Sequence, residues 1–156
     1  MLLCSTLEVT FDEDGKKVKK PVTVSTWDFA GQEIYYTTHE FFLSDHSVFL
    51  LVWDLSKDEQ DSRVAFWLNS IHSRAPNAPI ILVGTHLDDP VCLQEGYVEN
   101  VLKKLKEKYK PRFPMLKHAF AVSCAWSNAD GMIALLESIR VTISEMSIMG
   151  QSIPKT

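Results

Sequence analysis

The sequence predicts an α/β domain with a mostly parallel sheet that is preceded by an antiparallel hairpin. Three observations lead to this prediction. The chain opens with an alternating apolar–polar segment and an Asp-Gly pair, apolar runs of strand length recur from residue 47 onward, and segments with helical spacing of apolar residues separate those runs. Strands that alternate with helices are the pattern of α/β folds.

The first two predicted strands are expected to form the hairpin. Leu7–Phe11 alternates apolar with polar residues, which suits a half-buried strand. The pair Asp14-Gly15 follows, and such a pair is typical of a tight hairpin turn because glycine tolerates a positive φ. Val18–Trp27 is then predicted to be the returning strand.

Three continuous apolar runs predict the parallel strands. They are Ser47–Trp53, Pro79–Gly84 and Ala119–Ser123. A run without a polar face indicates a strand that is covered on both sides, as in a parallel sheet under helices.

Between and after these runs, apolar residues share one face of each predicted helix. The aromatic residues are interpreted as part of the core. The helical faces are Val64, Trp67, Leu68 and Ile71; Val98, Val101, Leu102 and Leu105; and Ile133, Leu136, Ile139 and Ile143. The aromatic residues are Trp27, Trp53, Trp67, Trp126, Phe41 and Phe42.

Composition narrows the class of protein. With 156 residues, 46% hydrophobic and 23% charged, the chain is expected to form one globular domain. The net charge is −4, which argues against a nucleic-acid partner because such binding needs a basic stripe. The basic stretch Lys103–Lys108 is interpreted as the solvated face of a helix.

The expected location is cytoplasmic. Cys4, Cys92 and Cys124 are odd in number and lack CxxC spacing, which fits a reducing compartment and argues against disulfides and a zinc site. The first residues lack the pattern of a signal peptide, and no window approaches the ~20 apolar residues of a membrane span.

The first motif is Thr26–Gln32, at the end of the returning strand. Open α/β sheets bind ligands at the carboxyl ends of strands, and a carboxylate such as Asp28 can hold Mg²⁺ against nucleotide phosphates. Gly31 would let the backbone approach a phosphate, and Gln32 could orient an attacking water. The alternative is a simple strand-ending turn.

Two further motifs follow apolar strands. Gly84–Asp88 stands where GTPases read guanine with Asn-Lys-x-Asp; Asp88 is retained, whereas Thr85 and His86 replace Asn and Lys. Val122–Ala125 matches the Ser-Ala-Lys type of loop, with Cys124 at its middle position. The order of the three motifs, each closing a strand with a helix between, favours a nucleotide site.

With these residues the chain resembles the Roc (Ras of complex proteins) GTPase domain of the Roco family, to which the leucine-rich-repeat kinases belong. Roc domains often carry Thr-His-x-Asp, so this departure from Ras is itself typical of the family. The likeness runs from Leu7 to Glu145. It is carried by Trp27–Gln32, Val52–Ser56, Trp67–Ile71 and Leu82–Asp88.

The resemblance implies a Ras-like P-loop GTPase fold and roles for the matching positions. Asp28 would face Mg²⁺, Gly31 the γ-phosphate and Gln32 the catalytic water. Thr6 would be a second Mg²⁺ ligand, although the Gly that commonly follows two residues later is Glu8 here. The residues implied for guanine are Thr85, His86 and Asp88, with Ser123, Cys124 and Ala125 lining the base.

The resemblance also exposes a missing part. The sequence contains no Gly-x-x-x-x-Gly-Lys-Ser/Thr, so the first strand, the phosphate loop and the first helix are expected to be absent. Two central strands would then lose a neighbour and the sheet would have a gap, at a cost of roughly 1–3 kcal/mol for each unpaired buried group. Truncation is the favoured explanation; an upstream piece from another chain, or closure of the two half-sheets, are the alternatives.

The sequence therefore predicts a signalling switch that binds GTP or GDP with Mg²⁺ and, in the intact family site, hydrolyses GTP. Residues 1–148 would form this domain, and residues 149–156 a linker towards a COR (C-terminal of Roc) domain. The chain alone is expected to bind GTP poorly and to hydrolyse it negligibly. The alternative is a nucleotide-independent module for homodimerisation or protein interaction.

A metal-dependent hydrolase built on Asp28 and Asp54 is disfavoured because the sequence lacks the accompanying His/Asp cluster. Asp54 and Asp58 are interpreted instead as solvated loop residues. His39 and His46 are interpreted as surface or packing residues.

Overall fold

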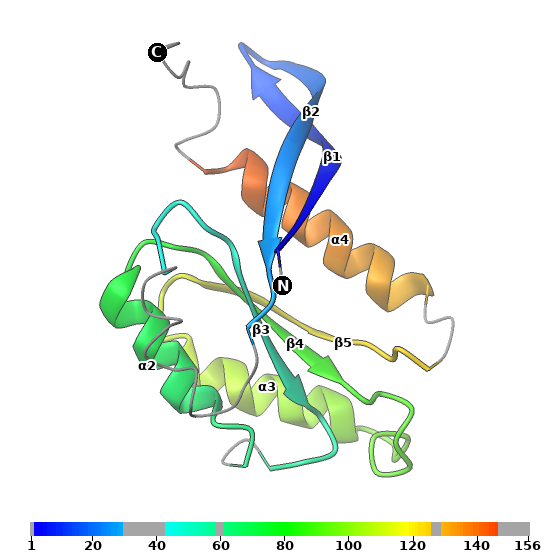
Figure 1. Cartoon of the computed structure of the whole chain (residues 1–156). Coiled ribbons are helices and arrows are strands. Elements are labelled where there is room, and N and C mark those ends of the chain that lie inside the picture. The colour runs from blue at the N-terminus through cyan, green and yellow to red at the C-terminus, as the bar shows by residue number, and fades with distance from the viewer. Residues whose placement is uncertain (1, 30–42, 59–60, 126–128, 147–156) are drawn as a thin grey trace. The chain divides into compact units, whose positions relative to one another are not determined.

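The computed structural model describes residues 2–29, 43–58, 61–125 and 129–146. The chain divides into two compact units, Met1–Phe42 with Glu137–Thr156, and Leu43–Leu136. We call these the hairpin unit and the sheet unit (Figure 1). The helix α4 (Ala129–Ser144) contributes residues to both.

The hairpin unit contains the predicted antiparallel pair. β1 (Leu2–Glu13) pairs with β2 (Lys16–Trp27) in an unbroken register from Leu2 opposite Trp27 to Glu13 opposite Lys16. Asp14 and Gly15 have φ values of 53° and 78°, so both turn residues are left-handed, as two-residue hairpin turns require. The predicted hairpin is confirmed, and both of its strands are longer than predicted.

The sheet unit contains the predicted parallel strands. β3 (Phe49–Asp54), β4 (Ile80–Thr85) and β5 (Leu116–Ala121) form a parallel sheet in the order β3-β4-β5. β1 and β2 form a separate two-stranded sheet.

Two helices pack on the sheet to form the core. α2 (Val64–Arg74) buries Val64, Leu68 and Ile71, the face predicted from their spacing. α3 (Tyr97–Tyr109) buries Leu105 and Tyr109 and packs its predicted residues Val98, Val101 and Leu102 against the same cluster. The core cluster also contains Leu51, Trp53, Leu55, Ile80, Leu82, Cys92, Phe113 and Leu116.

The prediction that all three strands are covered on both faces is wrong for β3. All residues of β4 are buried except Thr85, whereas Leu50 and Val52 of β3 are 44% and 57% exposed. β4 is the central strand, but β3 lies at the edge of its sheet, so part of one face stays open. In β5, the other edge strand, Lys117 and His118 are exposed, but both precede the predicted run Ala119–Ser123, whose residues are half-buried or buried.

Other side-chain predictions differ as well. Trp27 is 47% exposed rather than part of the core, because it is the last residue of β2 and lies opposite the first residue of β1. On α4, Ile143 is buried, but Ile133 is 63% exposed. His46 is exposed, as expected of a surface residue.

Several predictions fall on residues that the structure does not describe. They concern His39, Phe41, Phe42, Trp126 and the linker at residues 149–156.

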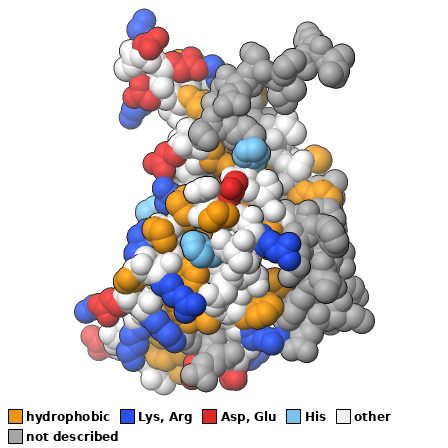
Figure 2. Space-filling view, turned by 90° about the vertical axis from the view of Figure 1, so that its left-hand side faces the viewer, with side chains coloured by type: hydrophobic (Ala, Val, Ile, Leu, Met, Phe, Trp, Pro, Cys, Tyr) orange, Lys and Arg blue, Asp and Glu red, His pale blue; other side chains and the backbone are white. Residues whose placement is uncertain are grey.

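Within the described ranges, no helix has the length and apolar character of a membrane span. Basic side chains on the face drawn in Figure 2 are interspersed with acidic and apolar ones.

Candidate functional site

Two predicted loops lie side by side in the sheet unit, after the carboxyl ends of β4 and β5. The strands are parallel neighbours, with Gly84 opposite Ala121. The Val122 N–H donates to the Gly84 carbonyl at 2.8 Å, and the Leu87 N–H donates to the Val122 carbonyl at 3.2 Å. These bonds bring together six predicted residues, which we call the loop cluster: Thr85, His86, Asp88, Ser123, Cys124 and Ala125.

Ser123 fixes the carboxylate of Asp88. Ser123 is 2% exposed, and its hydroxyl donates to Asp88 Oδ1 at 2.5 Å and accepts from the Ala125 N–H at 3.1 Å. The bond from Ser123, followed by a backbone bond and the nearby His86, holds the pKa of Asp88 below its ordinary value of 3.8. Asp88 is therefore an ionised acceptor at neutral pH, held at a defined place.

Cys124 and Ala125 have exposed side chains. Ala125 is nevertheless tied to the loop cluster through its backbone N–H and Ser123.

Thr85 and His86 form a second hydrogen-bonded pair. The Thr85 hydroxyl lies 3.1 Å from the Trp53 carbonyl oxygen, to which it donates, and 3.0 Å from His86 Nδ1. His86 has φ of 61°, a left-handed conformation that is uncommon for residues other than glycine. The side chain of His86 is 60% exposed.

Asp54 belongs to the same assembly, although the sequence predicted a solvated loop residue. Its side chain is only 18% exposed, and Oδ1 accepts from the Ser56 N–H at 3.0 Å and the Ser56 hydroxyl at 2.7 Å. Oδ1 also lies 3.4 Å from His86 Nδ1, and Lys57 Nζ lies 3.2 Å from Oδ2. The prediction that Asp54 is a solvated loop residue was wrong. The Asp-x-Ser pattern, in which the carboxylate accepts from the backbone N–H two residues later, is the sequence feature that could have indicated an ordered side chain.

These contacts decide the charge of Asp54. Partial burial by itself raises the pKa of Asp54, but the bonds from Ser56 and Lys57 and the nearby His86 outweigh it and hold that pKa below 3.8. Asp54 is thus a second ionised carboxylate, on the side of His86 that carries Nδ1.

Two predicted metal ligands lie in the hairpin unit. Asp28 follows β2 and is exposed, and Thr6 pairs with Thr23 in the hairpin. Asp28 lies five positions beyond Thr23, about 17 Å along an extended strand, so the structure does not bring Thr6 and Asp28 together. The described residues contain no group of three potential metal ligands. Gly31 and Gln32 lie outside the described residues.

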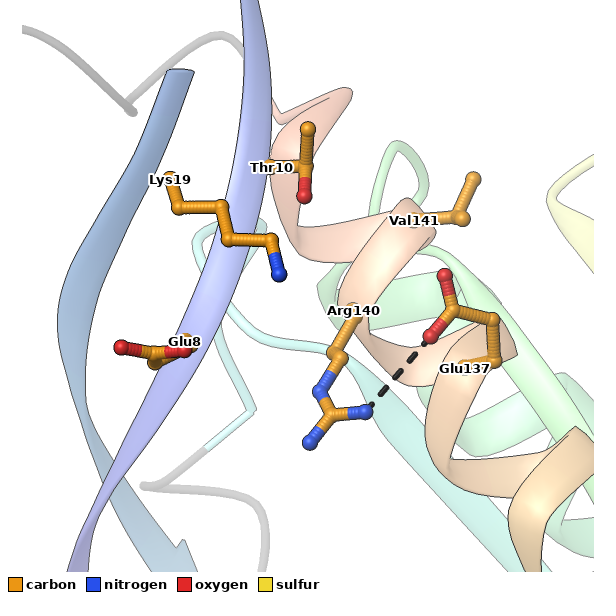
Figure 3. Close-up of a pocket in the computed structure, with 6 residues that line it drawn as sticks. All are labelled: Glu8, Thr10, Lys19, Glu137, Arg140 and Val141. Carbon is orange, nitrogen blue, oxygen red and sulfur yellow. Dashed lines mark ion pairs between the residues drawn. The ribbon is translucent and has the colours of Figure 1, made fainter. Parts of the chain in front are cut away.

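The hairpin unit also contains a pocket of about 350 Å³ (Figure 3). None of the residues that line this pocket is a predicted site residue. Lys19 and Arg140 provide positive charge there, and Glu8 and Glu137 provide negative charge. Arg140 forms an ion pair with Glu137 at 3.6 Å. Because the charges balance, the pocket favours no single class of charged ligand.

A family model described as "Ras of Complex, Roc, domain of DAPkinase" matches residues 3–88, more than half of the chain. The chain belongs to the Roc family. Part of the loop cluster, up to Asp88, falls inside the matched range, and this Roc chain keeps the predicted order of strands and motifs.

Comparisons with individual proteins agree with the assignment to the Roc family. The Roc chain is 44% identical over 92% of its length to "Probable serine/threonine-protein kinase pats1" from Dictyostelium discoideum. It is 33% identical over 91% of its length to "Leucine-rich repeat serine/threonine-protein kinase 1" from Caenorhabditis elegans. The chain spans only 4% and 6% of these two relatives.

Among solved structures, the chain is similar to "Structure of methanosarcina barkeri Roco2 RocCORdC bound to GDP". The TM-score is 0.57 and the sequences are 28% identical, over 93% of this chain and 40% of that one. This similarity confirms the predicted Ras-like α/β fold.

Proposed function

We propose that the loop cluster binds the guanine base of GTP or GDP. The observation that carries this proposal is the Asp88 carboxylate, ionised and fixed by the buried Ser123. Guanine presents two adjacent N–H donors that one carboxylate can accept, whereas adenine lacks this pair, so the wrong base would leave a polar group unpaired. GDP in the similar Roco2 structure supports the proposal.

The same proposal extends to a GTP-hydrolysing signalling switch. Gln32 would orient the attacking water and the backbone of Gly31 would approach the γ-phosphate. Of the described residues, Asp28 fits Mg²⁺, since this ion is commonly held by one or two carboxylates with phosphates and water completing its shell. When bound, Mg²⁺ would supply charge neutralisation at the phosphates.

We also propose the domain organisation and location. Residues 1–148 would be the Roc domain, and residues 149–156 would lead towards a COR domain, which the Roco2 neighbour's title includes. Homodimerisation is part of the same proposal. The free cysteines Cys4, Cys92 and Cys124 support a cytoplasmic location.

The direct test is a titration of the ¹⁵N-labelled chain with GDP and Mg²⁺, followed by NMR because this method detects millimolar affinity. We expect saturable shifts in the loop cluster. Asp88→Ala should weaken binding about tenfold or more, because it leaves guanine donors unpaired. Asp61→Ala, at an exposed acidic residue outside the cluster, is the matched control and should bind like the parent chain.

A change of specificity tests the same carboxylate without relying on loss of binding. Xanthine replaces the amino donor of guanine with a carbonyl acceptor, and an Asn amide offers one donor and one acceptor. Asp88→Asn should therefore bind xanthosine diphosphate better than GDP. If the parent chain and Asp88→Asn showed the same ratio of affinities for GDP and xanthosine diphosphate, the assignment of Asp88 would be contradicted.

The second candidate is a nucleotide-independent interaction module. The observation that favours it is the open side of β3, where Leu50 and Val52 are exposed on an edge strand and could receive a further β-strand. Absence of GDP shifts at millimolar concentration would favour this module. Multiple turnover of GTP by the pure chain would contradict the expectation that the chain alone hydrolyses GTP negligibly.

A further inference from the structure

The hydrogen bonds around Thr85 determine which nitrogen of His86 carries a proton. The Thr85 hydroxyl has one proton to donate. A backbone carbonyl can only accept, so the hydroxyl donates this proton to Trp53 O, at 3.1 Å. The contact of 3.0 Å between Thr85 Oγ1 and His86 Nδ1 then requires Nδ1 to be the donor. Nδ1 must therefore be protonated.

Asp54 reinforces the same assignment. Its Oδ1 lies 3.4 Å from His86 Nδ1 and, as an ionised carboxylate oxygen, can only accept. The bonds from Ser56 keep this oxygen in place. The proton on Nδ1 thus faces two acceptors, Thr85 Oγ1 and Asp54 Oδ1, from two neighbouring strand ends.

The other ring nitrogen has a different environment. The side-chain hydrogen bond and the ion-pair contact of His86 with the described residues both involve Nδ1, and its side chain is 60% exposed. In a neutral imidazole, a proton on Nδ1 leaves Nε2 with a lone pair that can accept a hydrogen bond. The charged groups that interact with the ring are Asp54 and Asp88, and Lys57 is paired with Asp54.

We infer that Thr85 and Asp54 are positioning residues that hold His86 as its Nδ1–H tautomer, so that Nε2 accepts a hydrogen bond from a donor of the bound nucleoside. The donor is either a ribose hydroxyl or the guanine amino group. The second half of this inference rests on the proposed guanine site. The first half concerns the unliganded chain alone.

The tautomer is measured without nucleotide. A long-range ¹H–¹⁵N spectrum of the labelled chain at about pH 8.5, well above the model-compound value of 6.5 for histidine, distinguishes protonated from unprotonated ring nitrogens. The His86 signals are assigned from their loss in His86→Gln. We expect the proton on Nδ1; a proton on Nε2 in the parent chain would overturn the inference, whether or not GDP binds.

Paired variants test the two positioning residues. Thr85→Val and Asp54→Ala each remove an acceptor and should shift the tautomer ratio towards Nε2–H by about two- to twelvefold, the range for one net hydrogen bond. Thr85→Ser and Asp54→Asn each retain an acceptor oxygen and should keep the Nδ1–H tautomer. An unchanged ratio in both acceptor-free variants would overturn the positioning role.

The contact between Nε2 and the nucleoside is tested by replacing His86 with Gln or Asn, whose side-chain amides each mimic one ring nitrogen. Gln places its amide near Nε2 and Asn near Nδ1, so His86→Gln should retain more GDP affinity than His86→Asn. Backbone preference alone predicts the reverse, because Asn tolerates the left-handed conformation of His86 better than Gln. Asn equal to or better than Gln would overturn the role of Nε2.

Two analogues identify the donor. If a ribose hydroxyl is the donor, the advantage of Gln over Asn disappears with dideoxy-GDP; if the amino group is the donor, it disappears with inosine diphosphate. Persistence with both analogues would overturn the nucleoside contact. Failure of the proposed guanine site is distinct, because the parent chain would then show no GDP shifts that depend on Asp88.

Discussion

Gly84 provides a sharp test of packing directly before the loop cluster. This residue lies in the central strand β4, between Trp53 and Ala121. A Cβ atom at position 84 would lie 2.5 Å from Leu55 Cγ, 2.7 Å from Cδ2 and 3.0 Å from Cδ1. Leu55 is fully buried, so its side chain has no open space into which it can rotate. We therefore expect Gly84→Ala to destabilise the fold through overpacking.

The expected magnitudes follow from these three contacts. Overpacking of a core costs about 1–3 kcal/mol, so Gly84→Ala should lower the free energy of unfolding by that amount. Leu55→Ala should cost about 2–5 kcal/mol because it leaves a cavity. It also deletes all three atoms that the new Cβ would meet. The double variant should then be no less stable than Leu55→Ala alone, with a coupling of about 1–3 kcal/mol between the two sites.

Urea unfolding, followed by tryptophan fluorescence, measures this cycle, since Trp53 is 4% exposed and belongs to the same core. A cost of 2 kcal/mol corresponds to a shift of the midpoint by about 1 M. Leu93→Ala, at a leucine that is 58% exposed, is the control and should change stability by less than about 0.5 kcal/mol. Additive costs in the double variant would refute the argument.

Two other expectations concern titration and reactivity. The folded pKa of Asp88 lies below 3.8, so its bond from Ser123 stabilises the fold above pH 3.8, and this contribution disappears as the pH falls through the lowered value. The difference in urea midpoint between the parent chain and Ser123→Ala should therefore be constant from pH 7 to pH 5 and narrow by pH 3; a constant difference would contradict this linkage. Burial, followed by the charges of Asp89, Asp54 and Asp88, raises the pKa of the Cys92 thiol. Iodoacetamide should therefore modify the exposed Cys4 and Cys124 before Cys92, and peptide mapping by mass spectrometry would contradict this order if Cys92 reacted equally fast.

The features that were predicted correctly depend on local sequence. The Asp14-Gly15 turn requires two left-handed residues, and this chemistry is visible in two adjacent positions. β4 from Ile80 to Gly84 has no polar side chain and is buried on both faces, because a central parallel strand has no solvated side. The loop cluster was predictable because its two motifs each close a strand, and parallel neighbours end at the same edge.

The features that were missed depend on neighbours distant in sequence. Leu50 and Val52 belong to an apolar run like that of β4, but their exposure depends on the order of strands. Asp54 resembles an ordinary loop carboxylate until its distance to His86, 32 positions away, is known. Spacing within one segment could not reveal that contact.

The difference between the two open sheet edges has a consequence for handling the protein. β2 carries Lys16, Lys17, Lys19 and Lys20 in its N-terminal half, and lysines on an edge strand discourage pairing with another molecule. β3 has the sequence Phe-Leu-Leu-Val-Trp-Asp, with no basic residue and two exposed aliphatic side chains. We expect concentrated solutions of the chain to become turbid through contacts made at β3. Val52→Lys should therefore improve colloidal stability more than further charge on the hairpin.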